Sequence, residues 1–163
     1  MRKSITIHPI GVIRTPYKEP EGIPIQGKFK DDVTGKAELF PEYKEGLKDI
    51  EGFSHVILIY YFDRAREERL VGRPFLEEDE HGIFAIRSPT RPNRLGLSVV
   101  KLIGVEGSAI VFSEVDILDN TPLIDIKPYV SYFDACEGVR NGWIEKHLRD
   151  GTPIDRIILK NKK

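Results

Sequence analysis

The chain has 163 residues, of which 40% are hydrophobic and 31% are charged, and its formal net charge is −1. This composition excludes a disordered chain, and the near-zero charge excludes a globally basic surface, so any contact with nucleic acid must use a local patch. A single cysteine excludes a disulfide framework within the chain and a cysteine-based zinc site. We therefore expect one domain, residues 1–163, that buries a core of its own.

The N-terminal residues are basic but lack the apolar core and the small-residue cleavage site of a signal peptide. The longest apolar run, residues 56–62, is too short to span a bilayer. With one cysteine and no export signal, the sequence predicts a soluble protein of the cytoplasm that does not enter a membrane.

Most of the chain is predicted to form short strands separated by turns. Alternating or β-branched patterns predict strands over residues 4–13, 37–40, 55–62, 83–87, 97–105 and 109–118. Gly107 and Ser108 predict a hairpin between the last two of these strands. Helical patterns are limited to residues 41–50 and 134–149. So many short strands favour a mainly β fold, a small closed or nearly closed barrel with one or two short helices, because closure removes exposed strand edges.

Two long loops, residues 15–36 and 64–82, interrupt this pattern, and loops of this length are usually functional or mobile. Several familiar motifs are missing. No Gly-x-Gly-x-x-Gly follows a strand and no phosphate-binding Gly-Lys-Ser/Thr occurs, so the sequence favours a non-Rossmann fold. The four histidines are scattered, so we expect no catalytic metal.

The most informative pattern lies in residues 86–97. This stretch contains Arg87, Arg91 and Arg94 together with two prolines, which fix φ and remove backbone donors. A stiff loop of this kind presents guanidinium groups in a fixed arrangement, which suits carboxylates, phosphates and base edges. Its positive charge has no acidic neighbour in the sequence between residues 80 and 106. The alternative is an ordinary surface loop with solvated arginines.

Five segments, in this order and at this spacing, closely resemble the TsaA-like proteins, also called the TrmO family. They are residues 10–17 (IGVIRTPY), 24–26 (PIQ), 52–56 (GFSHV), 87–97 (RSPTRPNRLGL) and 116–129 (DILDNTPLIDIKPY). The resemblance covers about residues 5–150. It implies a small β-barrel that works as a homodimer with S-adenosylmethionine bound near the subunit interface. The implied activity is methylation of N6 of threonylcarbamoyl-adenosine 37, in the anticodon loop of tRNA.

One departure from the family pattern concerns length. Bacterial relatives carry an extra C-terminal domain thought to help with tRNA, whereas this sequence stops soon after the family core. Two alternatives to the implied activity therefore stay open. In the first alternative, the protein is a non-catalytic module that binds S-adenosylmethionine or RNA. In the second, it is a methyltransferase with another substrate.

The resemblance also implies which residues contact the cofactor. Arg87 suits a bidentate grip on the methionine carboxylate, and the amide of Gln26 suits an adenine edge or the methionine end. Leu97 would contact the cofactor through its apolar side chain or its backbone. The alternative is that it belongs only to the hydrophobic core. The full set is Pro24, Ile25, Gln26, His55, Val56, Arg87, Leu97, Asp119, Asn120, Thr121 and Pro122.

The residues that would touch RNA or act as a base are less defined. Arg91, Arg94 and Lys127 are the candidates for RNA contacts, and a catalytic base is sought among Asp119, Asp125, Tyr129 and His55. Residues 125, 127 and 129 alternate, so they share one face of a strand. That face either lines the reaction chamber or forms the outside of the barrel.

Overall fold

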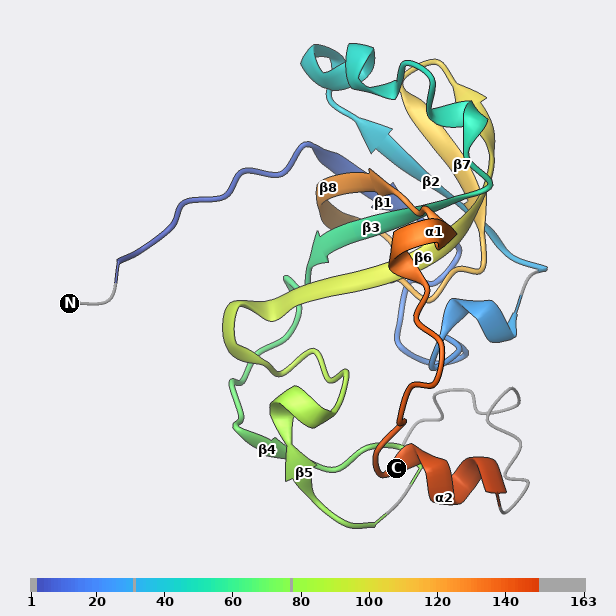
Figure 1. Ribbon diagram of the computed structural model, residues 1–163. Coiled ribbons are helices and arrows are strands. Elements are labelled where there is room, and N and C mark those ends of the chain that lie inside the picture. Colours follow the sequence, from blue (N-terminus) through green and yellow to red (C-terminus); the bar gives the residue numbers. More distant parts are fainter. Residues whose placement is uncertain (1–2, 31, 77, 150–163) are drawn as a thin grey trace.

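The centre of the molecule is a closed barrel of six antiparallel strands, as the computed structural model shows for residues 3–149 except 31 and 77 (Figure 1). The strands are β1 Gly11–Arg14, β2 Thr34–Leu39, β3 His55–Tyr61, β6 Leu95–Glu106, β7 Ala109–Ser113 and β8 Thr121–Pro128. Their order is β1-β2-β7-β6-β3-β8, and pairing of β8 with β1 closes the ring. The predicted mainly β, non-Rossmann barrel is confirmed.

The interior of the barrel is filled by alternate residues of every strand. Along β3, Val56, Leu58 and Tyr60 are buried, whereas the residues between them are partly exposed. Phe112 from β7 and Leu123 from β8 are fully buried and pack in the same core. Burying one side chain of this size stabilises the fold by roughly 1.5–3 kcal/mol, so this alternation sets which strand faces turn inward.

The hairpin predicted at Gly107 and Ser108 is confirmed, since β6 and β7 pair as antiparallel neighbours around it. Gly107 has φ of 66°, a left-handed conformation that glycine adopts without steric cost. Strand β7 ends earlier than the pattern predicts. Glu114 has φ of 64°, which turns the chain out of the ladder after Ser113.

A long connection, residues 62–94, joins β3 to β6. It carries a small two-stranded sheet, β4 Val71–Gly72 and β5 His81–Gly82, followed by the 3-10 helix η4 Ile83–Ala85. The prediction of a strand over residues 83–87 was wrong, because a short apolar run without alternation does not distinguish a strand from a buried helical turn. The arginine stretch then forms the 3-10 helix η5 Pro92–Arg94, directly before β6.

The predicted helices are shorter than their patterns. Residues 41–50 form the 3-10 helix η2 Pro41–Leu47, and η3 Ile50–Gly52 follows it, whereas η1 Gly27–Phe29 lies in the first long loop. The second pattern yields only α1 Ser131–Asp134 and α2 Ile144–Arg149. Gly138 and Gly142 adopt positive φ between them, which interrupts a helix. Among the described residues, every helix is too short or too polar to traverse a bilayer.

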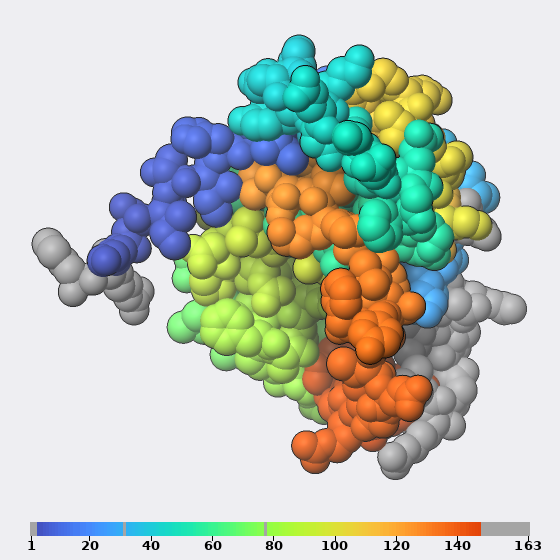
Figure 2. Space-filling view, turned by 45° about the horizontal axis from the view of Figure 1, so that its top comes forward, coloured from blue at the N-terminus to red at the C-terminus, as the bar shows by residue number. Residues whose placement is uncertain are grey.

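Although the Ile10 N–H donates to the Leu123 oxygen at 2.8 Å, residues 3–9 do not form the strand that their alternation predicts. They leave the barrel as an exposed arm, in which Ile5 is 85% exposed (Figures 1 and 2). Strand β1 begins only at Gly11, where pairing with β2 and β8 starts. β-branched residues favour an extended backbone, but a strand also needs a neighbour for its backbone groups, and along residues 3–9 the described chain supplies none.

Candidate functional site

The structure brings two of the predicted cofactor segments into direct contact. Arg87, which follows η4, donates from Nη1 to Oε1 of Gln26 at 3.0 Å. The amide nitrogen of Gln26 donates in turn to the backbone oxygen of Ile25 at 2.8 Å, which fixes the orientation of the side chain. Residues far apart in the sequence therefore meet in the fold, and their role in binding the cofactor stays a prediction.

Asp116 lies beside this pair, and the sequence analysis did not include it among the site residues. Its Oδ1 accepts a hydrogen bond from Ser98 Oγ at 2.7 Å, and its Oδ2 accepts one from the backbone N–H of Gly27 at 3.2 Å. Burial raises the pKa of the Asp116 carboxyl, and these two hydrogen bonds together with the positive charge of Arg87 oppose that rise. A carboxylate and a guanidinium thus share one site.

The sequence contained one signal for Asp116. It stands between Val115 and Ile117, which are both buried. An acidic residue in an apolar stretch is rarely buried without a partner, so such a residue is a candidate for a specific contact. The partners themselves, Ser98 and Gly27, come from distant segments and are evident only in the fold.

The start of η1 is pressed tightly against the connection between β7 and β8. A Cβ atom at Gly27 would lie 1.6 Å from the backbone oxygen of Glu114, so only glycine fits there. This close approach holds Gln26, the neighbouring residue, next to Asp116 and Arg87. The group formed by Gln26, Gly27, Arg87, Ser98 and Asp116 is called the Arg87 site below.

The segment 119–122 forms a second polar group. The carboxylate of Asp119 accepts hydrogen bonds from the Thr15 N–H at 3.0 Å and from Lys18 Nζ at 2.5 Å, and Arg64 donates to its backbone oxygen. Burial acts to raise the pKa of Asp119, but the contacts with Lys18 and Thr15 outweigh it and lower the pKa overall. An open cavity of about 330 Å³ lies beside this group.

No hydrogen bond or ion pair among the described residues joins this second group to the Arg87 site. The cavity beside it is lined by Arg14, Thr15, Pro16, Lys18, Thr34, Gly35, Lys36 and Asp119. Asn120 has a positive φ of 62° and Thr121 donates to the backbone oxygen of Leu118 at 2.8 Å, so these residues shape the turn into β8. The role of residues 119–122 in binding the cofactor stays a prediction.

Replacing Asp119 by asparagine is expected to lower the free energy of unfolding by about 1–3 kcal/mol at neutral pH, because it removes a charge-assisted contact with Lys18. Since the folded-state pKa of Asp119 is lowered, the contribution of its charge is present above the unfolded-state pKa and is lost as the pH falls through the folded-state pKa. Thermal unfolding at neutral and at strongly acidic pH measures this. An equal deficit at both values would contradict the role of the charge.

The alternating residues 125, 127 and 129 lie on the outside of the barrel. Asp125 and Lys127 stand opposite Ile59 and Ile57, whose neighbours on β3 point inward. The two side chains form an ion pair of 2.7 Å. Of the two possibilities that the alternation left open, the structure therefore selects the outer face for them.

His55 and Tyr129 lie together near the start of β3. The backbone N–H of Tyr129 donates to the backbone oxygen of His55 at 3.1 Å, and their rings are 6.3 Å apart. His55 pairs with Lys101 on β6, far along the strand from Gly96, which pairs with Tyr60. Val56 is fully buried in the core, and Leu97 is half exposed on the outer face of β6. Within one chain, these predicted residues are not part of the Arg87 site.

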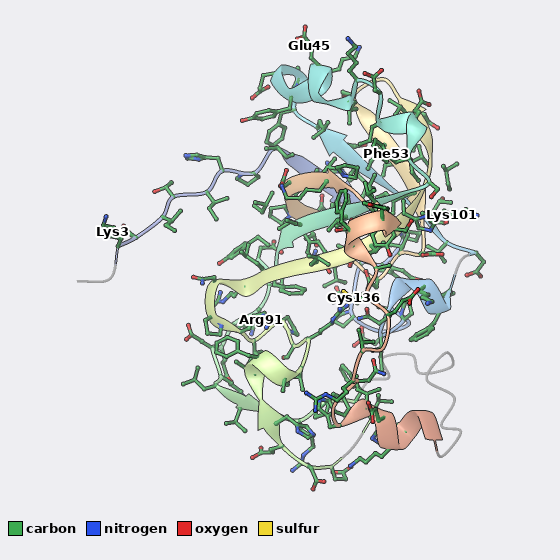
Figure 3. The ribbon with its side chains drawn as sticks, viewed as in Figure 1. Lys3, Glu45, Phe53, Arg91, Lys101 and Cys136 are labelled. Carbon is green, nitrogen blue, oxygen red and sulfur yellow. The ribbon has the colours of Figure 1, made fainter. Side chains whose placement is uncertain are left out.

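Arg91 lies in the segment between η4 and β6 (Figure 3), and Arg94 ends η5, where its backbone oxygen accepts from the Phe62 N–H just after β3 at 2.9 Å. Their guanidinium groups donate only weakly to backbone oxygens, Arg91 to Ile86 at 3.3 Å and Arg94 to Arg66 at 3.4 Å. Neither forms an ion pair with a carboxylate of the described residues. Their charges are therefore available to a ligand, as the sequence pattern predicts.

Relatives of known description share this fold. The chain is 53% identical over 144 residues to a probable S-adenosyl-L-methionine-binding protein of Pyrococcus abyssi, which covers 88% of this chain and 78% of the relative. It is 30% identical to a tRNA (adenine(37)-N6)-methyltransferase of Rattus norvegicus, over 93% of this chain and 37% of the relative. The crystal structure of TrmO from Pseudomonas aeruginosa matches with a TM-score of 0.75 and 39% identity, over 86% of this chain and 62% of that one.

The chain thus spans less than two thirds of the solved TrmO chain and well under half of the rat enzyme. Residues 12–135 match the family model described as the tRNA-methyltransferase O N-terminal domain, a range that begins at the second residue of β1 and includes the other barrel strands and the Arg87 site. The chain belongs to the tRNA-methyltransferase O N-terminal domain family.

Proposed function

We propose that the Arg87 site binds S-adenosylmethionine. The methionine end of this molecule is a zwitterion, and the site places a guanidinium and a carboxylate together, Arg87 for the α-carboxylate and Asp116 for the ammonium group. Gln26, which presents both a donor and an acceptor, adds a third polar contact. The observation that carries this proposal is that Arg87 and Asp116 bond to the adjacent residues Gln26 and Gly27, which brings the two charges near each other. Relatives described as S-adenosyl-L-methionine-binding proteins support it.

The proposed reaction is transfer of the methyl group to N6 of threonylcarbamoyl-adenosine 37 in tRNA. Bound S-adenosylmethionine would supply an electrophilic methyl group, and attack by N6 would form the N–C bond as the S–CH3 bond breaks in line, releasing S-adenosylhomocysteine. The N6 proton would be lost to a base or to water. Catalysis then consists mainly of positioning both partners and excluding water. The name of the rat relative supports N6 of adenine 37 in tRNA as the target. A base among Asp119, Asp125, Tyr129 and His55 stays a prediction, since none of the four belongs to the Arg87 site of the same chain.

Contacts with RNA are assigned to the two arginines whose charges are not neutralised, Arg91 and Arg94. Both follow Arg87 closely in the chain, so a nucleic acid bound by them would lie next to the proposed cofactor. Phosphate contacts of this kind weaken as salt concentration rises. Lys127 is already paired with Asp125 on the outer face, so its role in RNA binding requires that this ion pair open.

A homodimer is part of the same proposal. Four apolar side chains face outward along β6: Leu95, Leu97, Val99 and Ile103, which are between 38% and 56% exposed. The outer face of an antiparallel strand is usually polar, so a row of this kind indicates a protein interface. A second copy would present the same row, which allows a two-fold symmetric contact.

Replacing Val99 by lysine is expected to shift the protein from dimer to monomer, because the substitution would place a charge in the apolar row. Sedimentation velocity at several concentrations measures the change. Lys101→Met, on the same strand and face, is the matched control and should leave the dimer intact. A wild-type protein that sediments as a monomer at all concentrations would remove the dimer from the proposal.

The decisive experiment incubates the purified protein with labelled S-adenosylmethionine and tRNA that carries threonylcarbamoyl-adenosine, and then identifies the nucleosides by mass spectrometry. A methylated threonylcarbamoyl-adenosine supports the reaction, the substrate and the target atom together. Cofactor binding without label transfer would favour the alternative, a non-catalytic binding protein or a methyltransferase with another substrate. Absence of cofactor binding would refute the proposal.

A further inference from the structure

A chain of hydrogen bonds leads from the barrel core to the Asp116 carboxylate. Tyr60 Oη lies 3.0 Å from Ser98 Oγ, and Ser98 Oγ lies 2.7 Å from Asp116 Oδ1. An ionised carboxylate only accepts hydrogen bonds, so the single hydroxyl proton of Ser98 is directed to Asp116. Tyr60 must then donate to Ser98. The chain therefore has one direction, from Tyr60 through Ser98 to Asp116.

The fold makes room for Tyr60 at one particular place. Tyr60 on β3 pairs with Gly96 on β6, and a Cβ atom at Gly96 would lie 2.2 Å from the Tyr60 ring. The ring thus crosses the glycine to bring its hydroxyl to Ser98, two residues further along β6. Phe62 packs edge-on against it, with ring centroids 5.3 Å apart. Tyr60 is 5% exposed, and burial raises the pKa of its phenol, so it remains a proton donor.

The charge of Asp116 depends on what surrounds it. Burial acts against the ionised form, and three contacts favour that form: the Ser98 hydroxyl on β6, the Gly27 N–H at the start of η1 and the positive charge of Arg87 after η4. The Tyr60 hydroxyl on β3 polarises the Ser98 hydroxyl further, since each hydrogen bond in a chain strengthens the next.

We propose that Tyr60 and Ser98 are positioning residues, which hold the Asp116 carboxylate charged and oriented beside Arg87 so that the two together accept the ends of an α-amino acid. The inference rests on the proposed function, because the amino acid is the methionine end of S-adenosylmethionine. Tyr60 and Ser98 act on the ligand through Asp116 and need not touch it.

The test is calorimetric titration of S-adenosylmethionine into the wild type, Ser98→Ala and Tyr60→Phe over a series of buffers from acidic to neutral pH, because the pKa of the Asp116 carboxyl is raised. The ammonium group needs an ionised Asp116, so affinity falls as the pH drops through the pKa of this group. Ser98→Ala removes a hydrogen bond to the carboxylate and raises that pKa further. We expect about ten-fold weaker binding at neutral pH, and a loss on acidification that begins at higher pH.

Tyr60→Phe should move affinity and pH profile in the same direction by a smaller amount, because the contact between Ser98 and Asp116 persists. Ile110→Val in β7 is the control for a general loss of stability, since Ile110 is fully buried in the core and takes no part in the hydrogen-bond chain. Thermal unfolding shows that each variant is folded, and the Ile110→Val profile should match the wild type.

The possible results separate the inference from the proposed function. If the wild type binds and the pH profile of Ser98→Ala is unchanged, the positioning role is wrong while the site stands. An equal shift in Ile110→Val would mean that the effect is only structural, which also refutes the role. If the wild type does not bind at any pH, the proposed function fails and this inference fails with it.

Discussion

Replacing Arg87 by alanine is expected to weaken the binding of S-adenosylmethionine by about 1.5–3 kcal/mol, which is roughly a ten- to 150-fold rise in Kd. Among the residues that the structure describes, Arg87 donates only to the amide oxygen of Gln26, at 3.0 Å, and that oxygen can accept from water instead when the ligand binds. The guanidinium is then free to form two parallel hydrogen bonds with the α-carboxylate. Alanine removes both, and leaves Asp116 without its positive neighbour.

Calorimetric titration of S-adenosylmethionine into the wild type and Arg87→Ala measures this change in Kd. Two further variants test whether the guanidinium group itself is responsible. Arg87→Lys keeps the charge and loses the planar fork, so its affinity should lie between the wild type and Arg87→Ala. Arg73→Ala is the matched control. Arg73 belongs to the same connection between β3 and β6, but it is half exposed and forms an ion pair with Glu78 at 3.1 Å. Its affinity should equal that of the wild type. Unchanged affinity in Arg87→Ala would remove Arg87 from the site.

The barrel could be predicted from the sequence because its strands carry their own signals. Gly107 and Ser108 mark a hairpin, and the apolar run that contains Val56 and Leu58 has the length of a strand. The arm at residues 3–9 shows the limit of such signals. Its alternation is as regular as that of a true strand, but pairing depends on where neighbouring strands lie, which a local pattern does not contain.

The same limit applies to the site. Arg87 and Gln26 could be predicted, because a recognisable pattern surrounds each of them. Tyr60 and Ser98 come from β3 and β6, and Asp116 lies in the connection between β7 and β8, so their contact follows only from the closed barrel. Alternation places residues on a common face but does not say which face is inside. For Asp125 the register with β3 decided this, with a bulge between Ile59 and Tyr60.

The substitution with the largest expected effect on the shape of the site is Gly27→Ala. The new Cβ atom would meet the backbone oxygen of Glu114 at 1.6 Å and its carbonyl carbon at 2.3 Å. Backbone atoms cannot rotate away as a flexible side chain can, so the loop itself has to move. This movement breaks the hydrogen bond from the Gly27 N–H to Asp116 and displaces Gln26, its neighbour.

We expect Gly27→Ala to lower the free energy of unfolding by about 1–3 kcal/mol. We also expect it to weaken the binding of S-adenosylmethionine by roughly ten- to 150-fold, which corresponds to about 1.5–3 kcal/mol for the loss of a hydrogen bond to a charged group. Gly46→Ala in η2 is the matched control, because nothing lies within 4 Å of a Cβ atom there. It should bind as the wild type does and unfold at nearly the same temperature.

Thermal unfolding and calorimetry on the same two variants separate stability from binding. If Gly27→Ala loses stability but retains full affinity, the loop before η1 does not belong to the ligand site, and the contact between Gln26 and Arg87 has no role in binding. If it loses affinity while most of the protein remains folded, the close approach of Gly27 to Glu114 is what holds the loop in place for the ligand. The tight packing at one glycine would then account for the geometry of the whole site.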